Sequence, residues 1–158
     1  MGIYEISLAT MICINIILAV GLNMITGFCG QISLGHAAFY GIGAYCAAML
    51  AKAGASLPVS LLMGIVMAGI VGVIVGLTSL RVREDFLAIV TMGVGFLFVG
   101  VVRQQEALGG ELGISSIPSH GMGKLGFFML VLFLAALVTA FSLFVKHSWM
   151  GFAFDAVA

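Results

Sequence analysis

Charged side chains are scarce in this sequence, and their scarcity excludes an ordinary soluble domain. Lys and Arg number six and Asp and Glu number six, so charged residues make up 8% of the 158 residues and the formal net charge is zero. Soluble globular domains contain about one quarter charged residues. A sparse and balanced set of charges also argues against nucleic acid as a partner and against a basic anchor on the membrane surface.

Cysteine is scarce as well, and the placement of the three cysteines excludes two uses of thiols. Cys13, Cys29 and Cys46 all fall in apolar segments, and their spacing matches no metal site. An odd number of thiols in such segments does not indicate a disulfide framework. We therefore treat the three thiols as small core residues.

The usual motifs of enzyme active sites are missing too. The apolar segments hold no paired carboxylates and no Cys/His pair at a useful spacing, and the chain has no G-x-S-x-G motif. Gly109, Gly110 and Gly113 do not form a phosphate-binding loop, because no strand is predicted before them and no Lys-Ser or Lys-Thr follows. We expect no enzymatic activity, no catalytic residue, no metal and no cofactor.

Apolar residues dominate the chain, which indicates an integral membrane protein. They make up 63% of the sequence, and the mean hydropathy is +1.29. A transmembrane helix needs about 20 mostly apolar residues. This length predicts an all-α fold, a polytopic transmembrane helix bundle of about five spans within a single domain over residues 1–158. The spans are expected at residues 6–28, 32–50, 58–80, 86–102 and 125–145.

Basic residues divide evenly between the two sides of the predicted bundle. One side carries Arg81, Arg83 and Lys146, and the other carries Lys52, Arg103 and Lys124. The tighter cluster at Arg81 and Arg83 favours that side as cytoplasmic, with the N-terminus of the chain outside and the C-terminus inside. The connection over residues 103–124 is longer than most loops, which indicates a functional role.

A glycine-rich run with polar side chains, residues 30–45, interrupts the second predicted span. It carries Gln31, Ser33 and His36 where lipid tolerates little polarity. An unsatisfied amide or hydroxyl in an apolar medium costs roughly 2–7 kcal/mol. The run must therefore face protein or water, and we predict a discontinuous second span beside a polar route.

Each polar candidate has a structural reading beside the functional one. His36 either borders a polar pathway or, as we favour, forms a hydrogen bond with a carbonyl at the helix break. Asn15 and Asn23 lie on the same side of the first span and favour contact with another helix, although for Asn23 substrate contact is equally open. Thr91 lies in a small, slightly polar patch that is more typical of packing than of a pore lining.

Small residues recur at every fourth position of the third span, at Gly64, Ala68, Gly72 and Gly76. Such a face lets helix backbones approach closely. Packing within the same bundle is favoured over dimerisation, because apolar helices are rich in glycine in any case.

Four blocks of sequence, in order, resemble a known family of permeases. They are GFCGQISLGHAAF at 27–39, LRVREDFLAIVT at 80–91, GGELGI at 109–114 followed by Ile117-Pro118, and SWMGFAF at 148–154. By these blocks the chain resembles the permease subunits of branched-chain amino acid ABC transporters, the livM-type group. It resembles an N-terminal portion that lacks the first helix and the C-terminal half.

The resemblance implies a transport subunit of the cell inner membrane that forms part of a translocation pathway for branched-chain or related small amino acids, or for urea or short amides. The implied partners are a second homologous permease subunit, two ATP-binding subunits that hydrolyse ATP, a periplasmic or extracellular substrate-binding protein and the lipid bilayer. The candidate substrate pathway comprises Asn23, Gln31, Ser33, Gly35, His36 and Thr91. Residues 146–158 would begin a cytoplasmic segment that couples to the ATPase, with Ser148, Trp149, Met150, Gly151, Phe152 and Asp155 as its candidate contacts.

The chain departs from the family pattern at three positions. Glu84 stands where glycine is usual, Phe96 where glutamate is common, and Phe152 where arginine is often found. The C-terminal half of the family pattern is also missing, and this keeps a non-transporting truncated fragment, or a helix-packing assembly partner in a membrane complex, as the alternative function. A self-contained channel is a weaker third reading, because about five helices enclose little space without oligomerisation.

Overall fold

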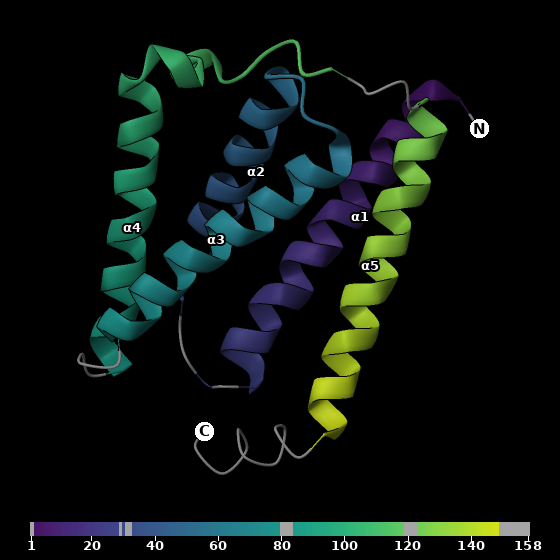
Figure 1. Ribbon diagram of the computed structural model, residues 1–158. Coiled ribbons are helices and arrows are strands. Elements are labelled where there is room, and N and C mark those ends of the chain that lie inside the picture. The colour runs from purple at the N-terminus through teal and green to yellow at the C-terminus, as the bar shows by residue number, and fades with distance from the viewer. Residues whose placement is uncertain (1, 29, 31–32, 80–83, 119–122, 149–158) are drawn as a thin grey trace. The chain divides into compact units, whose positions relative to one another are not determined.

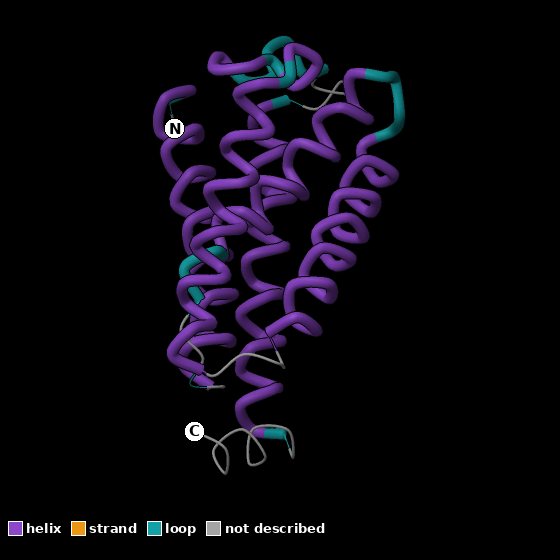
Figure 2. Tube along the Cα trace, turned by 90° about the vertical axis from the view of Figure 1, so that its left-hand side faces the viewer, coloured by secondary structure: helices purple, strands orange, loops and turns teal. Residues whose placement is uncertain are grey.

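The computed structural model describes residues 2–28, 30, 33–79, 84–118 and 123–148 (Figure 1). Every regular element in these ranges is helical, as Figure 2 shows, which confirms the predicted all-α class. The chain divides into two compact units, one formed by Met1–Gln31 with Gly121–Ala158 and the other by Ile32–His120.

The first unit is a pair of helices from the two ends of the chain. It contains α1 (Ile3–Asn23), which continues as the π-helix η1 (Met24–Phe28), and α5 (Lys124–His147). Figure 1 shows α1 and α5 side by side and running in the same direction. Their contact is built on the small buried side chains of Cys13, Val131 and Ala135. Since these side chains are short, the two helix backbones can approach closely.

The second unit holds the central helices and the long connection. Its elements are α2 (His36–Lys52), α3 (Leu57–Ser79), α4 (Glu84–Gln104) and the short 3-10 helices η2 (Glu106–Leu108) and η3 (Gly110–Leu112). The helices α2 and α3 form an antiparallel hairpin, and α4 runs beside α2 in the same direction (Figure 1). In the turn of the hairpin Gly54 has a φ of +90°, a conformation that glycine adopts without steric cost.

The crossing of α2 and α3 depends on facing glycines. A Cβ atom placed on Gly64 would lie 2.7 Å from the carbonyl oxygen of Gly43, so Gly64 has no room for a side chain, and one placed on Gly43 would lie 3.2 Å from the carbonyl oxygen of Gly64, a tight contact. Ala68 also faces Gly43, whereas Cβ atoms placed on Gly72 or Gly76 would meet no described heavy atom within 4 Å. The predicted packing role of the small face is therefore confirmed for its first half only.

Among the described residues, four helical stretches are long and apolar enough to cross a membrane, which confirms a polytopic bundle. They are Ile3–Gly27, Leu57–Thr78, Phe86–Gln104 and Lys124–His147. The remaining long helix, α2, has 17 residues and is shorter than the usual span of about 20. We expected the second span to begin at residue 32 and to be broken within the glycine-rich run. The helix instead begins at His36 and is continuous, so the non-helical backbone lies before it.

Candidate functional site

The segment that leads into α2 is held against α4 by one threonine. The backbone N–H of Leu34 donates a hydrogen bond to Oγ1 of Thr91, with the two atoms 3.1 Å apart. The Thr91 hydroxyl in turn donates toward the carbonyls of Leu87 and Ala88, at 3.0 and 3.1 Å. Its side chain is 4% exposed. A side chain thus supplies the acceptor that a preceding helical turn would otherwise supply.

Gly35 packs directly on the same residue. A Cβ atom placed on Gly35 would overlap the carbonyl oxygen of Thr91 and lie 2.9 Å from its carbonyl carbon. The φ of Gly35 is −97°, so available space rather than backbone conformation requires glycine here. The expected close backbone approach at Gly35 is confirmed, and Thr91 is the residue it approaches.

The first turn of α2 presents polar groups without side-chain partners. The N–H of Ala38 donates to the carbonyl of Gly35 at 2.9 Å, and no side chain caps the helix. The first N–H groups of a helix lack partners within the helix and carry its positive end of the dipole. In the part of the chain that the structure describes, neither Ser33 Oγ nor the ring of His36 forms a hydrogen bond, so the expected bond from His36 to a carbonyl is not seen there. Gln31 lies outside the described residues.

Asn23 lies in the other compact unit, where α1 changes into a π-helix. A Cβ atom placed on Gly27 would overlap Oδ1 of Asn23, so the asparagine side chain lies against the glycine that follows it by four residues. Single π-helical turns are frequent at functional sites. We expected Asn15 to contact another helix, but the hydrogen bond that its amide makes within the described part of the chain is to the carbonyl of Met11 in its own helix, at 2.8 Å. Short polar side chains in a helix commonly form hydrogen bonds with a backbone carbonyl of the preceding turn of the same helix.

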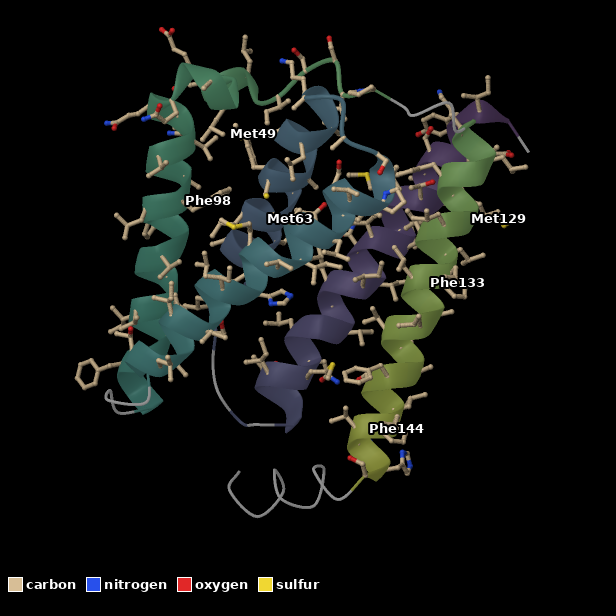
Figure 3. All side chains as sticks on the ribbon, viewed as in Figure 1. Met49, Met63, Phe98, Met129, Phe133 and Phe144 are labelled. Atoms are coloured by element: carbon tan, nitrogen blue, oxygen red, sulfur yellow. The ribbon has the colours of Figure 1, made fainter. Side chains whose placement is uncertain are left out.

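A second line of contacts between α2 and α4 escaped our reading of the sequence. The Phe98 ring lies against Gly41 and meets the Tyr45 ring edge to face, with centroids 5.8 Å apart and an interplanar angle of 79°. Figure 3 shows Phe98 pointing from α4 toward α2. The sequence spacing could have indicated these contacts. Gly41 and Tyr45 are four residues apart, Thr91 and Phe98 are seven residues apart, and both spacings place two residues on the same face of a helix.

Of the proposed coupling contacts, the structure describes Ser148 alone. Ser148 ends α5, and its N–H and its hydroxyl both donate to the carbonyl of Val145, at 3.2 and 2.9 Å. Trp149, Met150, Gly151, Phe152 and Asp155 lie outside the described residues.

Comparison with known proteins gives a family and two close relatives. The model of the family described as "Branched-chain amino acid transport system / permease component" matches residues 5–158. The high-affinity branched-chain amino acid transport system permease protein LivM of Escherichia coli (strain K12) is 39% identical over 124 residues, which cover 77% of this chain and 29% of that protein. LivM of Salmonella typhimurium (strain LT2) is 38% identical over 125 residues, which cover 78% of this chain and 29% of that protein.

The chain thus spans less than a third of the length of these two relatives. No solved structure matches it.

Proposed function

The chain belongs to the family of branched-chain amino acid transport permease components, and on that premise we propose that it forms part of the translocation pathway of an ATP-binding-cassette importer. Members of this family are transport components rather than enzymes, and the long apolar helices make the chain a multi-pass membrane protein. The proposed substrates are branched-chain or related small amino acids, in keeping with the names of the two relatives.

The proposed partners follow from the same premise. They are a second homologous permease, two ATP-binding subunits on which ATP is hydrolysed, and a substrate-binding protein outside the membrane. We treat residues 1–158 as one permease domain of the inner membrane, with residues 146–158 beginning the contact to the ATP-binding subunits. A cytoplasmic location of residues 146–158 is supported by the cluster of Arg81 and Arg83, which we place on the same side of the membrane and which favours that side as cytoplasmic.

The single observation that carries the proposed pathway is the non-helical segment before α2. Its Leu34 N–H is satisfied by Thr91, whereas the polar groups of Ser33 and His36 have no partner among the described residues. Polar groups in the membrane face protein, water or a polar ligand, because hydrocarbon cannot satisfy them. In other transporters the ends of interrupted helices meet the charges of the substrate. We therefore assign Ser33 and His36 to the pathway and retain Asn23 and Gln31 as further candidates.

Thr91 and Gly35 have a different place in this proposal. The hydroxyl of Thr91 is occupied by contacts to Leu34, in the segment before α2, and to its own helix, and Gly35 is buried against Thr91. They shape the pathway by holding its wall in position, whereas the half-buried Ser33 and His36 provide polar groups without a described partner.

The direct test is leucine uptake into proteoliposomes that contain the full-length permease pair, the ATP-binding subunits and the binding protein. Ser33→Leu removes a polar group from the proposed pathway, and we expect the initial rate to fall by about tenfold, equivalent to one hydrogen bond. Ser115→Leu is the matched control on an exposed part of the connection and should retain uptake. Uptake that persists when the whole subunit is omitted would support the alternative, a helix-packing assembly partner.

A further inference from the structure

Two aromatic residues, Tyr45 and Phe98, join the middle of α2 to the middle of α4. A Cβ atom placed on Gly41 would overlap Cε1 of Phe98 and lie 2.7 Å from Cζ, so the ring fills the space that the glycine leaves. Tyr45 lies one helical turn beyond Gly41 and receives the same ring edge to face at a centroid distance of 5.8 Å. The neighbouring Phe96, at 67% exposure, has no such role. The Phe98 ring therefore sets the separation of α2 and α4 at this level.

The same two helices meet again at the polar segment. Thr91 precedes Phe98 by seven residues, which is two helical turns or about 10 Å along one face of α4. At the Thr91 level the contact consists of the Leu34 hydrogen bond and the close approach of Gly35. Because a helix behaves as a stiff rod over two turns, a change of separation at Phe98 is transmitted to the bond between Leu34 and Thr91.

The connection beyond α4 reaches the aromatic pair from the other side. A Cβ atom placed on Gly113 would lie 3.5 Å from Oη of Tyr45, and the φ of Gly113 is +72°. Gly113 therefore lies close to the Tyr45 hydroxyl, whereas the neighbouring Leu112 is 98% exposed. A displacement of the connection would therefore act on the Tyr45 ring.

We propose that Tyr45 and Phe98 are positioning residues that couple the connection over residues 105–118 to the polar segment before α2. The two rings hold the polar segment before α2 in place by setting the distance between α2 and α4. They respond to a displacement of the connection because Gly113 lies next to Tyr45. This role rests on the proposed function only in taking the polar segment as part of the translocation pathway; the mechanical coupling itself does not require transport.

The test measures the polar segment directly in the assembled full-length complex. All cysteines of the complex, Cys13, Cys29 and Cys46 among them, are replaced by alanine, Ser33→Cys supplies the single thiol, and its rate of reaction with a water-soluble maleimide is measured in membranes beside leucine uptake. We expect Phe98→Ala and Tyr45→Ala to change the labelling rate by about threefold or more, the lower range for residues that couple distant sites. Phe96→Ala, the same change on an exposed face of α4, should leave the rate unchanged. Tyr45→Phe keeps the edge-to-face ring contact with Phe98 and should keep the original labelling rate.

A second pair of variants tests the link to the connection without removing an aromatic ring. Gly113→Ala places a side chain next to Oη of Tyr45 on a backbone at φ +72° and ψ −179°, a conformation that is essentially restricted to glycine. Gly54→Ala is the control, because it also introduces alanine at a positive φ, +90°, but in the turn between α2 and α3 with no described atom within 4 Å. Gly113→Ala is expected to change labelling at position 33 and Gly54→Ala is not. These two variants still test the coupling if the Phe98→Ala protein is not produced in a folded form.

The two proposals fail in different ways. Equal labelling rates for Phe98→Ala and Phe96→Ala in a complex that takes up leucine would overturn the positioning role and leave the transport function intact. A response to Phe98→Ala and Gly113→Ala in a complex that takes up no leucine would establish the coupling and reject the transport function.

Discussion

Thr91 shows how one hydroxyl can satisfy two helices in an apolar environment. Its oxygen accepts the N–H of Leu34 while its proton is directed at carbonyls of α4. Most threonines in these helices do less, since Thr10, Thr78 and Thr139 each donate only to the carbonyl four residues earlier. The difference is the hydrogen bond from Leu34, which ties the segment before α2 to Thr91 on α4.

Replacing Thr91 with valine keeps the shape of the side chain and removes its hydroxyl. We expect Thr91→Val to destabilise the protein by about 1 kcal/mol, because the partly buried hydrogen bond from the Leu34 N–H loses its acceptor. The change is measured as a lower midpoint of thermal unfolding in detergent micelles. Thr91→Ser, which retains the hydroxyl, should lose less. The matched control is Thr78→Val on α3, whose hydroxyl bonds only to Ile74. Equal losses for the two valine variants would contradict the special role of Thr91.

At the scale of elements, close helix packing depends on where glycines face a backbone rather than on how many there are. Gly43 and Gly64 oppose each other across α2 and α3, and Gly35 and Gly41 oppose Thr91 and Phe98 across α2 and α4. Packing rather than hydrophobicity drives helix association in lipid, so these contact points determine how the second unit is assembled. The exposed glycines of α3 and α4 make no comparable contact with the described residues.

Alanine substitutions along α3 should separate the two kinds of glycine. In Gly64→Ala the new methyl group would lie 2.7 Å from a backbone oxygen of Gly43, which cannot move without shifting α2. We expect a loss of about 1–3 kcal/mol, typical of overpacking. In Gly72→Ala nothing lies within 4 Å, and the better helix propensity of alanine should leave stability unchanged or raise it. The readout is the rate of proteolytic cleavage in the turn at residues 53–56, which should rise for Gly64→Ala alone.

At the scale of the whole molecule, apolar side chains cover the outside of the helices. Ile65, Leu97 and Phe144 are each about 70% exposed, and Figure 3 shows Phe133 and Phe144 on the side of α5 away from α1. In water such surfaces would drive association, whereas a bilayer surrounds them without cost. This exterior agrees with the membership of the chain in a permease family.

The proposed orientation can be tested on intact cells. We expect the connection over residues 105–118 to lie outside and the end of α5 to lie in the cytoplasm, because the cluster of Arg81 and Arg83 favours the inner side. In the cysteine-free background, Ser115→Cys should react with a membrane-impermeant thiol reagent in intact spheroplasts. Ser148→Cys should react only after permeabilisation. The reverse pattern would invert the proposed topology.

Local composition alone determined the helices of this protein. Apolar runs long enough to cross a bilayer must satisfy their own backbone in lipid, and helix is the form that does so within one segment. The predicted span at residues 125–145 and the observed α5 (Lys124–His147) accordingly differ by only one or two residues at each end. The polar residues of the glycine-rich run were equally visible, since they stand out against apolar neighbours.

Only the tertiary structure decided where the glycine-rich run becomes helical and which residues it contacts. The sequence suggested a break within the second span, whereas in the structure α2 begins at His36 and the Leu34 N–H before it bonds to Thr91 on another helix. The contacts of Gly41 with Phe98 and of Gly113 with Tyr45 likewise depend on the rotation and register of helices that are distant in sequence. Apolar composition does not determine this rotation, because every apolar face of a helix can contact lipid equally well. Side-chain packing determines which face contacts the neighbouring helix.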